Sequence, residues 1–540
     1  MPGAAMYIVE NVGDAQDNYF TVNPQMTYFT SVFRKHTKFS IQTIKEGLDV
    51  KTLKGDGDTK IIYKIPRHGD LLKSMYLSIT LPDIYSGKYA GNNSYQFKWI
   101  RNLGQYMIKD MELLLGGTSI QKITGEYLDI SKELHCTPEQ KDAINVCTGN
   151  MPELYDPARG PGQVEMNSSS NFYVPVYPDS VSNTTANGVY GDIDGSYSAG
   201  GSIVNLTESD FSDVLPSIHG RKLKIPLDFF FQKNTGLAIP LIALRGMELE
   251  LRITLRPVQE LYTILNNTGA DANARQRGKD TVNITKFTTD TTTTNTSELL
   301  DVNTEIEMNY IFLSMNERRR FTTEVNRYLI EKVRKIEINN VNLTTNRSRS
   351  IEFTSDNHVK QLIFVPKRSD AKDVNEWDNF TNWINKDIPP YSFLGKFGES
   401  MYNNVKNEYC YPNLHIGGST LPSKSLMKKD IIDELEIYVD NNSLFEKQDG
   451  VYYQKQVPLE YHSSNPKDGV YVYSFALMPK EHQPTGSIGM AGHRIRCDFT
   501  FQELSGAFPA NTDYTFEMDI YVVEYNILKI MNGSGSFEFN

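Results

Sequence analysis

The chain has 540 residues, more than a single hydrophobic core usually supports, so we expect at least two domains. Hydrophobic residues make up 39% and aromatic residues 11% of it, which excludes wholesale disorder and favours strands over helices. The 55 Lys and Arg against 66 Asp and Glu give a formal net charge of -11, which argues against a global electrostatic hold on nucleic acid.

Neither the cysteines nor the apolar runs point to secretion. Cys136, Cys147, Cys410 and Cys497 form no C-x-x-C pair and are too few for a disulfide scaffold, which fits a reducing assembly site. Residues 1–10 lack the basic and apolar regions of a secretory signal, and no apolar run reaches the ~18 residues of a membrane span. We therefore expect a soluble protein that is made in the cytoplasm.

Short segments in which apolar and polar residues alternate recur along the chain, separated by stretches rich in Gly, Asn, Ser and Pro. This period of two predicts the strands of an all-β sandwich or barrel. The predicted strands include Leu77–Leu81, Leu113–Leu115, Leu249–Leu255, Leu435–Val439, Tyr471–Leu477 and Ile495–Phe499.

Helical signals are few. The clearest begins at Thr137, where a capping Thr, Pro138 at the first helical position and Gln140 at the third predict a short helix to about Val146. A second helix is expected from Asn316, as its cap, to about residue 326.

Polar stretches and an internal repeat divide the chain. Met111–Leu115, with a Gly-Glu-Tyr ten residues on, parallels Leu435–Val439 and a Gly-Val-Tyr at an offset of 324, slipping by one residue at the final Gly. This repeat favours two similar β-domains, with a chance match between two hairpins as the alternative. We assign residues 1–40 to an N-terminal arm, 41–287 to a first domain with a polar loop at 160–212, 288–300 to a Thr-rich junction, and 301–540 to a second domain with a loop at 367–428.

Ordered motifs spread over nearly the whole chain carry a resemblance to a known family. The most specific run lies between residues 13 and 39, and others follow around 66–72, 239–244 and 521–528. The motif residues are Asn23, Pro24, Gln25, Thr27, Phe29, Arg34, Lys35, His36, Thr37, Phe39, Pro66, Arg67, Gly69, Asp70, Pro240, Leu241, Tyr525 and Asn526. Together they resemble the double jelly-roll major capsid proteins of nucleocytoplasmic large DNA viruses. Two turns, Asn442–Phe445 and Gly489–Arg494, depart from the family pattern.

The resemblance implies an all-β fold of two tandem eight-stranded jelly-roll barrels, with long surface loops and a few short helices. It implies a structural subunit of an icosahedral capsid that forms homotrimers of roughly hexagonal outline, which then tile a shell in the virion. The implied partners are other copies of the chain, minor capsid and penton proteins, and an internal membrane, with assembly in the host cytoplasm. It implies no cofactor and no sequence-specific binding of nucleic acid.

Two groups of residues are candidate contact sites. Arg34, Lys35 and Lys38 could face an anionic membrane or acidic proteins at the inner side of the shell, although a solvated basic face is the alternative. Asn-x-Ser/Thr sequons suggest exposed tips that carry glycans, although a chain rich in Asn and Thr produces sequons by chance. They include Asn167, Asn183, Asn205, Asn266, Asn283 and Asn295.

Patterns for chemistry are missing from the sequence. The nine His form neither H-x-H nor H-E-x-x-H, so no metal ligand and no catalytic residue is expected, and the protein is predicted not to be an enzyme. The three arginines at 318–320 lie beside Glu317 and Glu324, which favours local ion pairs. The alternatives are a jelly-roll surface protein that binds sugars or a receptor, and a β-sandwich glycosidase.

Overall fold

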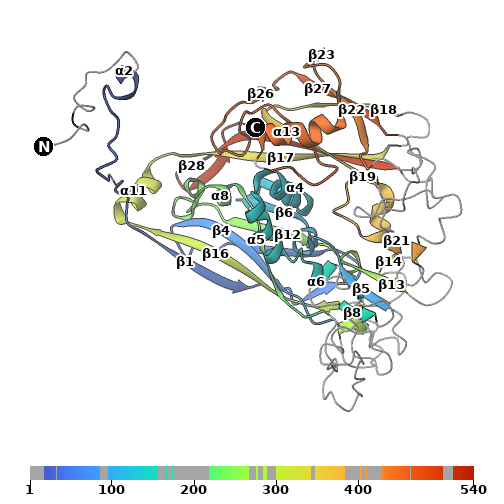
Figure 1. Ribbon diagram of the computed structural model, residues 1–540. Coiled ribbons are helices and arrows are strands. Elements are labelled where there is room, and N and C mark those ends of the chain that lie inside the picture. Colours follow the sequence, from blue (N-terminus) through green and yellow to red (C-terminus); the bar gives the residue numbers. More distant parts are fainter. Residues whose placement is uncertain are drawn as a thin grey trace.

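Two β-units, each made of a pair of antiparallel sheets, lie against each other in the computed structural model (Figure 1). The structure describes residues 6, 17–31, 33–84, 95–155, 164–167, 172–175, 218–266, 275–277, 284–288, 299–341, 347–382, 402–403, 408–409, 429–462, 464–502 and 515–539. Most of each predicted loop, 160–212 and 367–428, lies outside these residues.

The first unit pairs two sheets of four main strands. One sheet has the order β1 (Phe39–Gly47), β16 (Asn303–Leu313), β4 (Leu71–Thr80), β10 (Lys222–Pro226), and the other β3 (Thr59–Lys64), β12 (Leu249–Leu255), β6 (Ile108–Leu115), β7 (Thr118–Thr124). Of the four strands in the first sheet, β16 comes last in the chain but lies between β1 and β4, the two that come first. This crossed order is that of a jelly roll, in which two Greek keys fold onto each other.

The second unit repeats this order strand for strand. Its sheets run β17 (Asn326–Val341), β28 (Phe516–Met531), β19 (His358–Arg368), β25 (Tyr471–Ser474), and β18 (Ser348–Thr354), β27 (Arg494–Phe501), β22 (Ile432–Val439), β23 (Asn442–Ser443), with β24 (Gln448–Asp449) also on β22. The predicted all-β fold of two jelly rolls is confirmed.

The repeat extends to single residues. A Cβ on Gly125 would lie 2.0 Å from the carbonyl oxygen of Ile108, and a Cβ on Gly450 would lie 2.4 Å from that of Ile432. Each carbonyl belongs to the first residue of the equivalent strand, β6 or β22. Because no side chain fits there, both hairpins end on glycine. The predicted internal repeat is therefore confirmed.

The remaining strands are short and decorate the two barrels. They are β2 (Thr52–Lys54), β5 (Tyr95–Trp99), β8 (Val164–Asn167), β9 (Phe172–Pro175), β11 (Ile239–Pro240), β13 (Tyr262–Asn266), β14 (Arg275–Arg277), β15 (Leu299–Asp301), β20 (Tyr402–Asn403), β21 (Glu408–Tyr409), β26 (Ile488–Gly489) and β29 (Ser534–Phe537). In Figure 1, β8, β14 and β21 lie at the end of the molecule opposite to α11 (Met315–Thr323) and the N-terminal arm. The two ends of the subunit therefore differ in structure.

Helices fill the connections. The α-helices besides α11 are α2 (Asp17–Phe20), α3 (Leu103–Met107), α4 (Gly125–His135), α5 (Pro138–Thr148), α6 (Pro152–Tyr155), α8 (Phe230–Lys233), α10 (Thr285–Thr288) and α13 (Val457–Tyr461). The 3-10 helices are η3 (Thr235–Leu237), η4 (Leu241–Ala243), η5 (Val258–Glu260) and η6 (Ser369–Val374), and η7 (Tyr452–Gln456) is a π-helix. Among the described residues, none of these helices has the length and apolar character needed to cross a membrane.

The two predicted helices had different outcomes. At α5 the predicted capping box is confirmed, since the Thr137 hydroxyl accepts from the Gln140 amide at 3.4 Å and the Gln140 side chain accepts from the Thr137 amide at 3.1 Å. The prediction that Asn316 caps α11 is wrong. The helix begins one residue earlier, after Ser314, so Asn316 already lies within its first turn.

The predicted boundary between the domains was also wrong. Residues 301–313 were assigned to the second domain, but β16 pairs with β1 and β4 and closes the first barrel. A jelly roll places its last strand between earlier ones, so the Thr-rich run precedes the closing strand and does not separate the units. Most of that run, 289–298, lies outside the described residues.

One sheet of the second unit is buried on both faces. Along β28, Ile520 and Val522 belong to the core of the second barrel, whereas Tyr521 and Val523 belong to the cluster of the first. Alternate side chains of a strand point to opposite faces, so this sheet separates the two cores. The outward face of the second unit's sheet is therefore the contact between the barrels.

Candidate functional site

The helix α4 lies between the two barrels (Figure 1). We call the interface between α4 and the outward face of the sheet of β17, β28, β19 and β25 the joint. The helix starts where the Thr124 hydroxyl accepts from the amide of Tyr127 at 3.2 Å, directly after β7. Nine of its residues are buried, among them several that are polar or charged. Polar groups placed this deeply require partners, and the second barrel supplies them.

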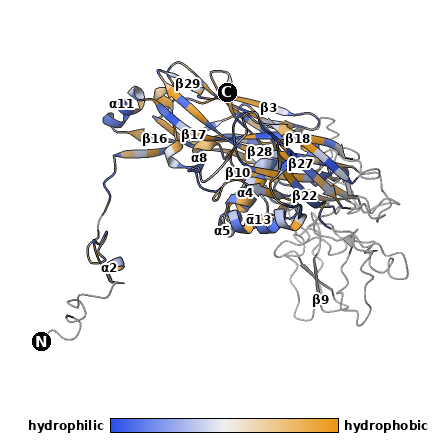
Figure 2. Ribbon diagram, turned by 90° about the horizontal axis from the view of Figure 1, so that it is seen from above, coloured by the Kyte–Doolittle hydropathy of each residue, from blue (hydrophilic) through white to orange (hydrophobic). Residues whose placement is uncertain are grey.

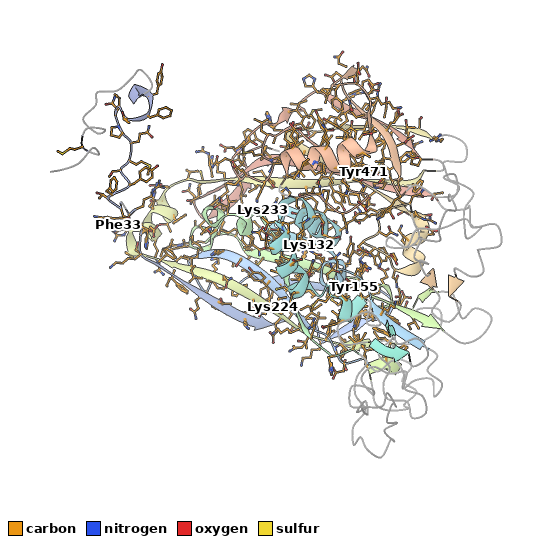
Figure 3. All side chains as sticks on the ribbon, viewed as in Figure 1. Phe33, Lys132, Tyr155, Lys224, Lys233 and Tyr471 are labelled. Carbon is orange, nitrogen blue, oxygen red and sulfur yellow. The ribbon has the colours of Figure 1, made fainter. Side chains whose placement is uncertain are left out.

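Three ion pairs cross the joint. Their acidic and basic partners are Glu126 with Lys367, Asp129 with Lys467, and Lys233 with Glu331, the last at 3.0 Å between Nζ and Oε2. Lys360, which belongs to the second unit like Glu331, also pairs with that carboxylate. Figure 3 shows Lys132 and Lys233 between the two units. In each of the three pairs, a charged side chain of one barrel thus faces the opposite charge on the other barrel.

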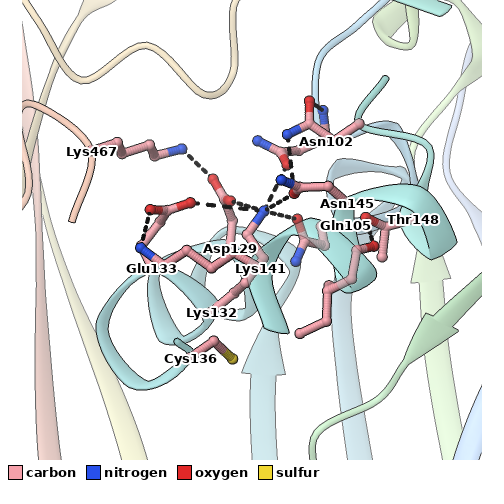
Figure 4. A network of polar contacts seen from close by, with 12 residues as sticks. Asn102, Gln105, Asp129, Lys132, Glu133, Cys136, Lys141, Asn145, Thr148 and Lys467 are labelled. Carbon is pink, nitrogen blue, oxygen red and sulfur yellow. Dashed lines mark hydrogen bonds and ion pairs between the residues drawn. The ribbon is translucent and has the colours of Figure 1, made fainter. Parts of the chain in front are cut away.

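Asp129 is the centre of the most extensive of these networks (Figure 4). It is fully buried, accepts hydrogen bonds from the Tyr106 hydroxyl at 3.0 Å and from Lys467, and forms an ion pair with Lys132 at 3.1 Å. Burial alone would raise its pKa, but Lys467 and Lys132 hold the pKa of the Asp129 carboxyl well below its usual range. The carboxylate therefore stays charged.

Lys132 is held in turn by amide oxygens. Its Nζ donates to Asn102 at 2.8 Å, Asn145 at 3.1 Å and Gln105 at 3.3 Å. Each of the three N–H groups of this buried ammonium thus has an acceptor. These contacts hold α4 against α3 and α5 within the first unit.

Aromatic rings fill the space between the charges. The rings of Tyr127 and Tyr521 lie 5.4 Å apart, one from each unit, and the Tyr521 hydroxyl donates to Glu126 at 2.9 Å. Further along the joint, the side-chain amide of Gln121 donates to the backbone carbonyl of Glu331 at 3.1 Å. Tyrosine pairs of this kind combine apolar contact with a defined hydrogen-bond direction.

Two histidines also meet in the joint. The rings of His135 and His462 lie 5.6 Å apart in an edge-to-face arrangement. Burial, with Lys360 nearby, lowers the pKa of His462 to about 4, and burial with Lys233 nearby lowers the pKa of His135 well below its usual value. Both rings are therefore neutral at pH 7, beside a carboxylate and two lysines that are charged.

An open cleft of about 1180 Å³ lies beside the joint and is lined by both units. Its walls carry charges of both signs, such as Lys122 and Lys335 against Glu337 and Asp519, and its lining residues include neither His nor Cys. Within the described part of the chain, no three His, Cys, Asp or Glu residues are grouped to hold a metal ion. The cleft is lined by charged side chains from both barrels.

The motif segment 66–70 anchors the start of β4. Asp70 accepts from the amide of Leu313 and from the guanidinium of Arg318, both at 2.8 Å, and so ties β16 to α11. A Cβ on Gly69 would lie 2.6 Å from the Cβ of Tyr310, whose hydroxyl donates to the carbonyl of Pro66 at 2.9 Å.

Two further motif segments, around Thr37 and Pro240, meet the segment 66–70 at the start of β4, and we call this region the arm root. Arg67 donates to the carbonyl of Met247 at 2.8 Å, and Pro240 pairs with the first residue of β4. Leu241 is buried in the turn after Pro240. The Thr37 hydroxyl donates to Glu317 of α11 at 2.8 Å, which fastens the arm just before β1 begins at Phe39.

The arm itself extends away from the two units (Figure 2). The motif residues Asn23, Pro24, Gln25, Thr27, Arg34 and Lys35, together with Lys38, are all exposed. His36 is exposed too, and its Nδ1 lies 2.8 Å from the carbonyl of Thr37. Aromatic side chains share this exposure, Phe29 being 97% accessible. A segment that exposes both aromatic and basic side chains is suited to a contact with a partner.

The other candidate residues lie elsewhere. Tyr525 and Asn526 are buried in β28, where the Asn526 side chain donates to the carbonyl of Phe539 at 3.0 Å, so they support the second barrel and not the arm root. Of the sequons, Asn167 and Asn266 end β8 and β13. Asn183, Asn205, Asn283 and Asn295 lie outside the described residues.

Local pairing of the arginine cluster is confirmed in part. Arg320 pairs with Glu324 at 2.9 Å as expected, whereas Arg318 reaches Asp70 of the first barrel. The joint residues were not predicted at all. The signal was a charged residue at every third position, Glu126, Asp129 and Lys132, between mostly apolar ones.

Comparison with known proteins supports a division of the chain between β16 and α11. Residues 27–314 match the family model described as major capsid protein N-terminus, and residues 317–536 match the model described as large eukaryotic DNA virus major capsid protein. Together the two models account for most of the chain, and the match changes from one to the other between the two barrels.

Individual relatives match over their full length. The chain is 26% identical over 593 residues to the major capsid protein of Phaeocystis pouchetii virus, with 100% of each chain covered, and 23% identical over 542 residues to that of Paramecium bursaria Chlorella virus 1, with 97% of each covered. Among solved structures, PBCV-1 VP54 is similar with a TM-score of 0.61 at 19% identity, covering 95% of this chain and 100% of that one. The Faustovirus major capsid protein is similar with a TM-score of 0.56 at 12% identity, covering 94% and 93%.

The ion pair between Asp129 and Lys467 can be tested by substitution. We expect Lys467→Met to lower the free energy of unfolding by about 3 kcal/mol, because it leaves a buried carboxylate with one lysine fewer. Lys372→Met removes a half-exposed lysine of the same unit that pairs with Glu517, and should cost less than about 1 kcal/mol. Urea unfolding measures both, and equal effects would contradict the role of the joint.

The buried histidines predict a loss of stability in mild acid. In the unfolded chain His462 binds a proton near pH 6.5, whereas in the folded chain it binds one only near pH 4. The contribution of His462 to the free energy of unfolding is therefore fully present above pH 6.5 and is lost as the pH falls towards 4. Between pH 7 and pH 4.5 this group should account for about 2 kcal/mol. We expect His462→Phe to remove that part of the pH dependence in urea titrations, and His219→Phe, at an exposed site, to retain it. A variant at 462 that follows the wild-type pH profile would rule the mechanism out.

Proposed function

Because this chain belongs to the major capsid protein family of large eukaryotic DNA viruses and is a structural subunit of the virion capsid, we propose that it works as a homotrimer of roughly hexagonal outline. The observation that carries this proposal is the duplication. Two barrels with the same strand order are held at a fixed orientation by the joint, so three chains present six similar walls. Such a unit tiles a shell by contacts between its sides.

The difference between the two ends of the subunit supports one end facing the interior of the shell and the other facing outwards. The arm and α11 are at one end, and short hairpins such as β8 are at the other (Figure 1). We propose that the arm end faces the interior, where Arg34, Lys35 and Lys38 contact an internal membrane or acidic minor capsid and penton proteins. The hairpin end then faces outwards, where the sequons near Asn167 and Asn266 would carry any glycans.

The proposed role is structural and involves no catalysis. Its support is the set of buried ion pairs, which fix the orientation of the two barrels. We further propose that the chain is made and assembled in the host cytoplasm, in keeping with cysteines that remain free at Cys136, Cys147 and Cys497.

The trimer is tested by mass. The purified chain should sediment with three times the 61.4 kDa mass of one chain, and negative-stain images should show particles of hexagonal outline. The expected cause is closed contact between like subunits. A stable monomer that binds sugars would contradict the proposal and favour a surface protein that binds sugars or a receptor.

The inner-face role of the arm is tested with vesicles. Replacing Arg34, Lys35 and Lys38 together by Glu should weaken binding to vesicles that contain phosphatidylserine at least tenfold, since each basic residue near an anionic surface contributes about 1 kcal/mol. The same change at three exposed lysines of the first barrel, Lys54, Lys60 and Lys64, should leave binding unchanged. Equal losses in the two triple variants, or none in either, would contradict a specific role of the arm.

A further inference from the structure

A short segment of the second unit lies against the end of helix α4. The segment follows α13 and comprises residues 462 and 464–467 of the described chain, and we call it the strap. The Ser464 hydroxyl is shared as a donor between the carbonyls of Glu133 at 2.9 Å and Cys136 at 3.1 Å. The last carbonyls of a helix have no partner within the helix, so the strap supplies one from the other barrel.

The two ends of the strap are held by different chemistry. At the far end, Lys467 pairs with the buried carboxylate of Asp129 (Figure 4). The near end begins with His462, whose ring meets that of His135 on α4. Both nitrogen atoms of the His462 ring are buried, and within the described residues neither has a hydrogen-bond partner. The near end is therefore held by the packing of a neutral ring and the far end by an ion pair.

The groups around the two histidines cannot balance added positive charge. The charged and titratable groups that face the pair are Lys233 on α8, Lys360 on β19, Glu331 on β17, Asp228 after β10 and His482 after β25. Glu331 already pairs with both lysines. Burial raises the pKa of the Asp228 carboxyl, so acid removes its charge sooner than usual. Among these groups, no carboxylate is free to balance a proton that binds to either ring.

We propose that protonation of His462 and His135 releases the strap from α4, so that the joint contains an acid-sensitive latch. The near end separates, because two charged rings 5.6 Å apart in a buried setting repel each other and the lysines beside them. Burial alone would raise the pKa of the Asp129 carboxyl, but Lys467 and Lys132 hold it well below its usual range. The ion pair at the far end therefore survives mild acid, and the strap swings about Lys467.

The rest of the joint opposes a complete separation of the barrels. Ile363, Val365 and Val523 of the second unit belong to the hydrophobic cluster of the first, and exposing such side chains to water is unfavourable. Acid therefore frees the end of α4 and leaves the sheet contact in place. The latch does not require the proposed trimer, since every group in it belongs to one chain. In the proposed shell, acid would reduce the rigidity of each subunit and leave both barrels folded.

Three native cysteines can report the release of the strap. Cys136 lies at the end of α4 where Ser464 binds, Cys147 is exposed on α5, and Cys497 is buried in the core of the second barrel. The probe is dithiodipyridine, an aromatic disulfide that reacts with thiols in mild acid, and peptide mass spectrometry follows each cysteine separately. Dividing the rate at Cys136 by the rate at Cys147 cancels the loss of thiolate with falling pH, which both thiols share.

We expect acid to raise this ratio of rates. From pH 7 to pH 5 it should rise roughly twentyfold, as expected of one histidine whose pKa burial lowers to about 4 in the closed state and which returns to about 6.5 in the open state. Cys497 should stay unreactive, because the second barrel remains folded. In the double variant His135→Phe with His462→Phe, two rings that cannot be protonated keep their edge-to-face contact, and the ratio should stay level.

Further variants separate the latch from general acid sensitivity. Ser464→Ala removes the hydroxyl that holds the strap and should raise the ratio about fivefold already at pH 7. His219→Phe, at an exposed site, should keep the wild-type rise. His462→Gln replaces the double variant if that variant does not fold, and should reduce the rise at least about fivefold. A level ratio in the wild type, a wild-type rise in the double variant, or Cys497 becoming reactive together with Cys136 would each overturn the latch.

Discussion

The relative orientation of the two barrels depends on charges buried between them. Glu331 receives a lysine from each unit, and Asp129 is fully buried between Lys132 of its own helix and Lys467 of the other barrel. A buried charge without a partner is destabilising by several kcal/mol, so a barrel that shifts or rotates loses more than the contact area alone implies. An apolar joint of the same size would tolerate sliding. The ion pairs make the pair of barrels one rigid body, and the arm and the hairpin end take their positions from it.

The same duplication has produced two surfaces of different chemistry. Within the chain, the helix after the first hairpin, α4, is charged and buried, whereas its counterpart in the second unit, which contains η7 and α13, exposes Val451 and Leu459. Groups within one chain meet at a high effective concentration, so the contacts between them can be selected for the orientation that they impose on the two barrels. Contacts between chains must also offset the loss of free motion on association, for which apolar burial is the effective source. In the proposed capsomer this difference separates a permanent joint from an assembly contact.

Sequence reasoning reached the fold more readily than the interfaces. Alternation in Leu249–Leu255 predicted β12 to the residue, because that strand has one buried and one exposed face. The closing strands were harder, since β28 is buried on both faces and shows little alternation, and the pairing of β16 with β1 joins residues more than 250 positions apart. The motif residues around Asp70 could be named in advance but not explained, because their partners Leu313 and Arg318 come from distant segments. The charges of the joint become recognisable as a site only when both barrels are present.

The placement of β16 also governs how the chain can fold while it is being made. Phe39 of β1 pairs with Leu313, so the first barrel has no closing strand until residue 313 has left the ribosome. At about 5 to 20 residues per second, the edges of β1 and β4 stay unpaired for roughly 15 to 50 seconds. An open strand edge is a template for pairing with other chains, and a polysome brings many such edges close together. A protein needed in many copies per particle thus spends its most aggregation-prone interval during synthesis, and factors that shield strand edges at that stage would control the yield of shells.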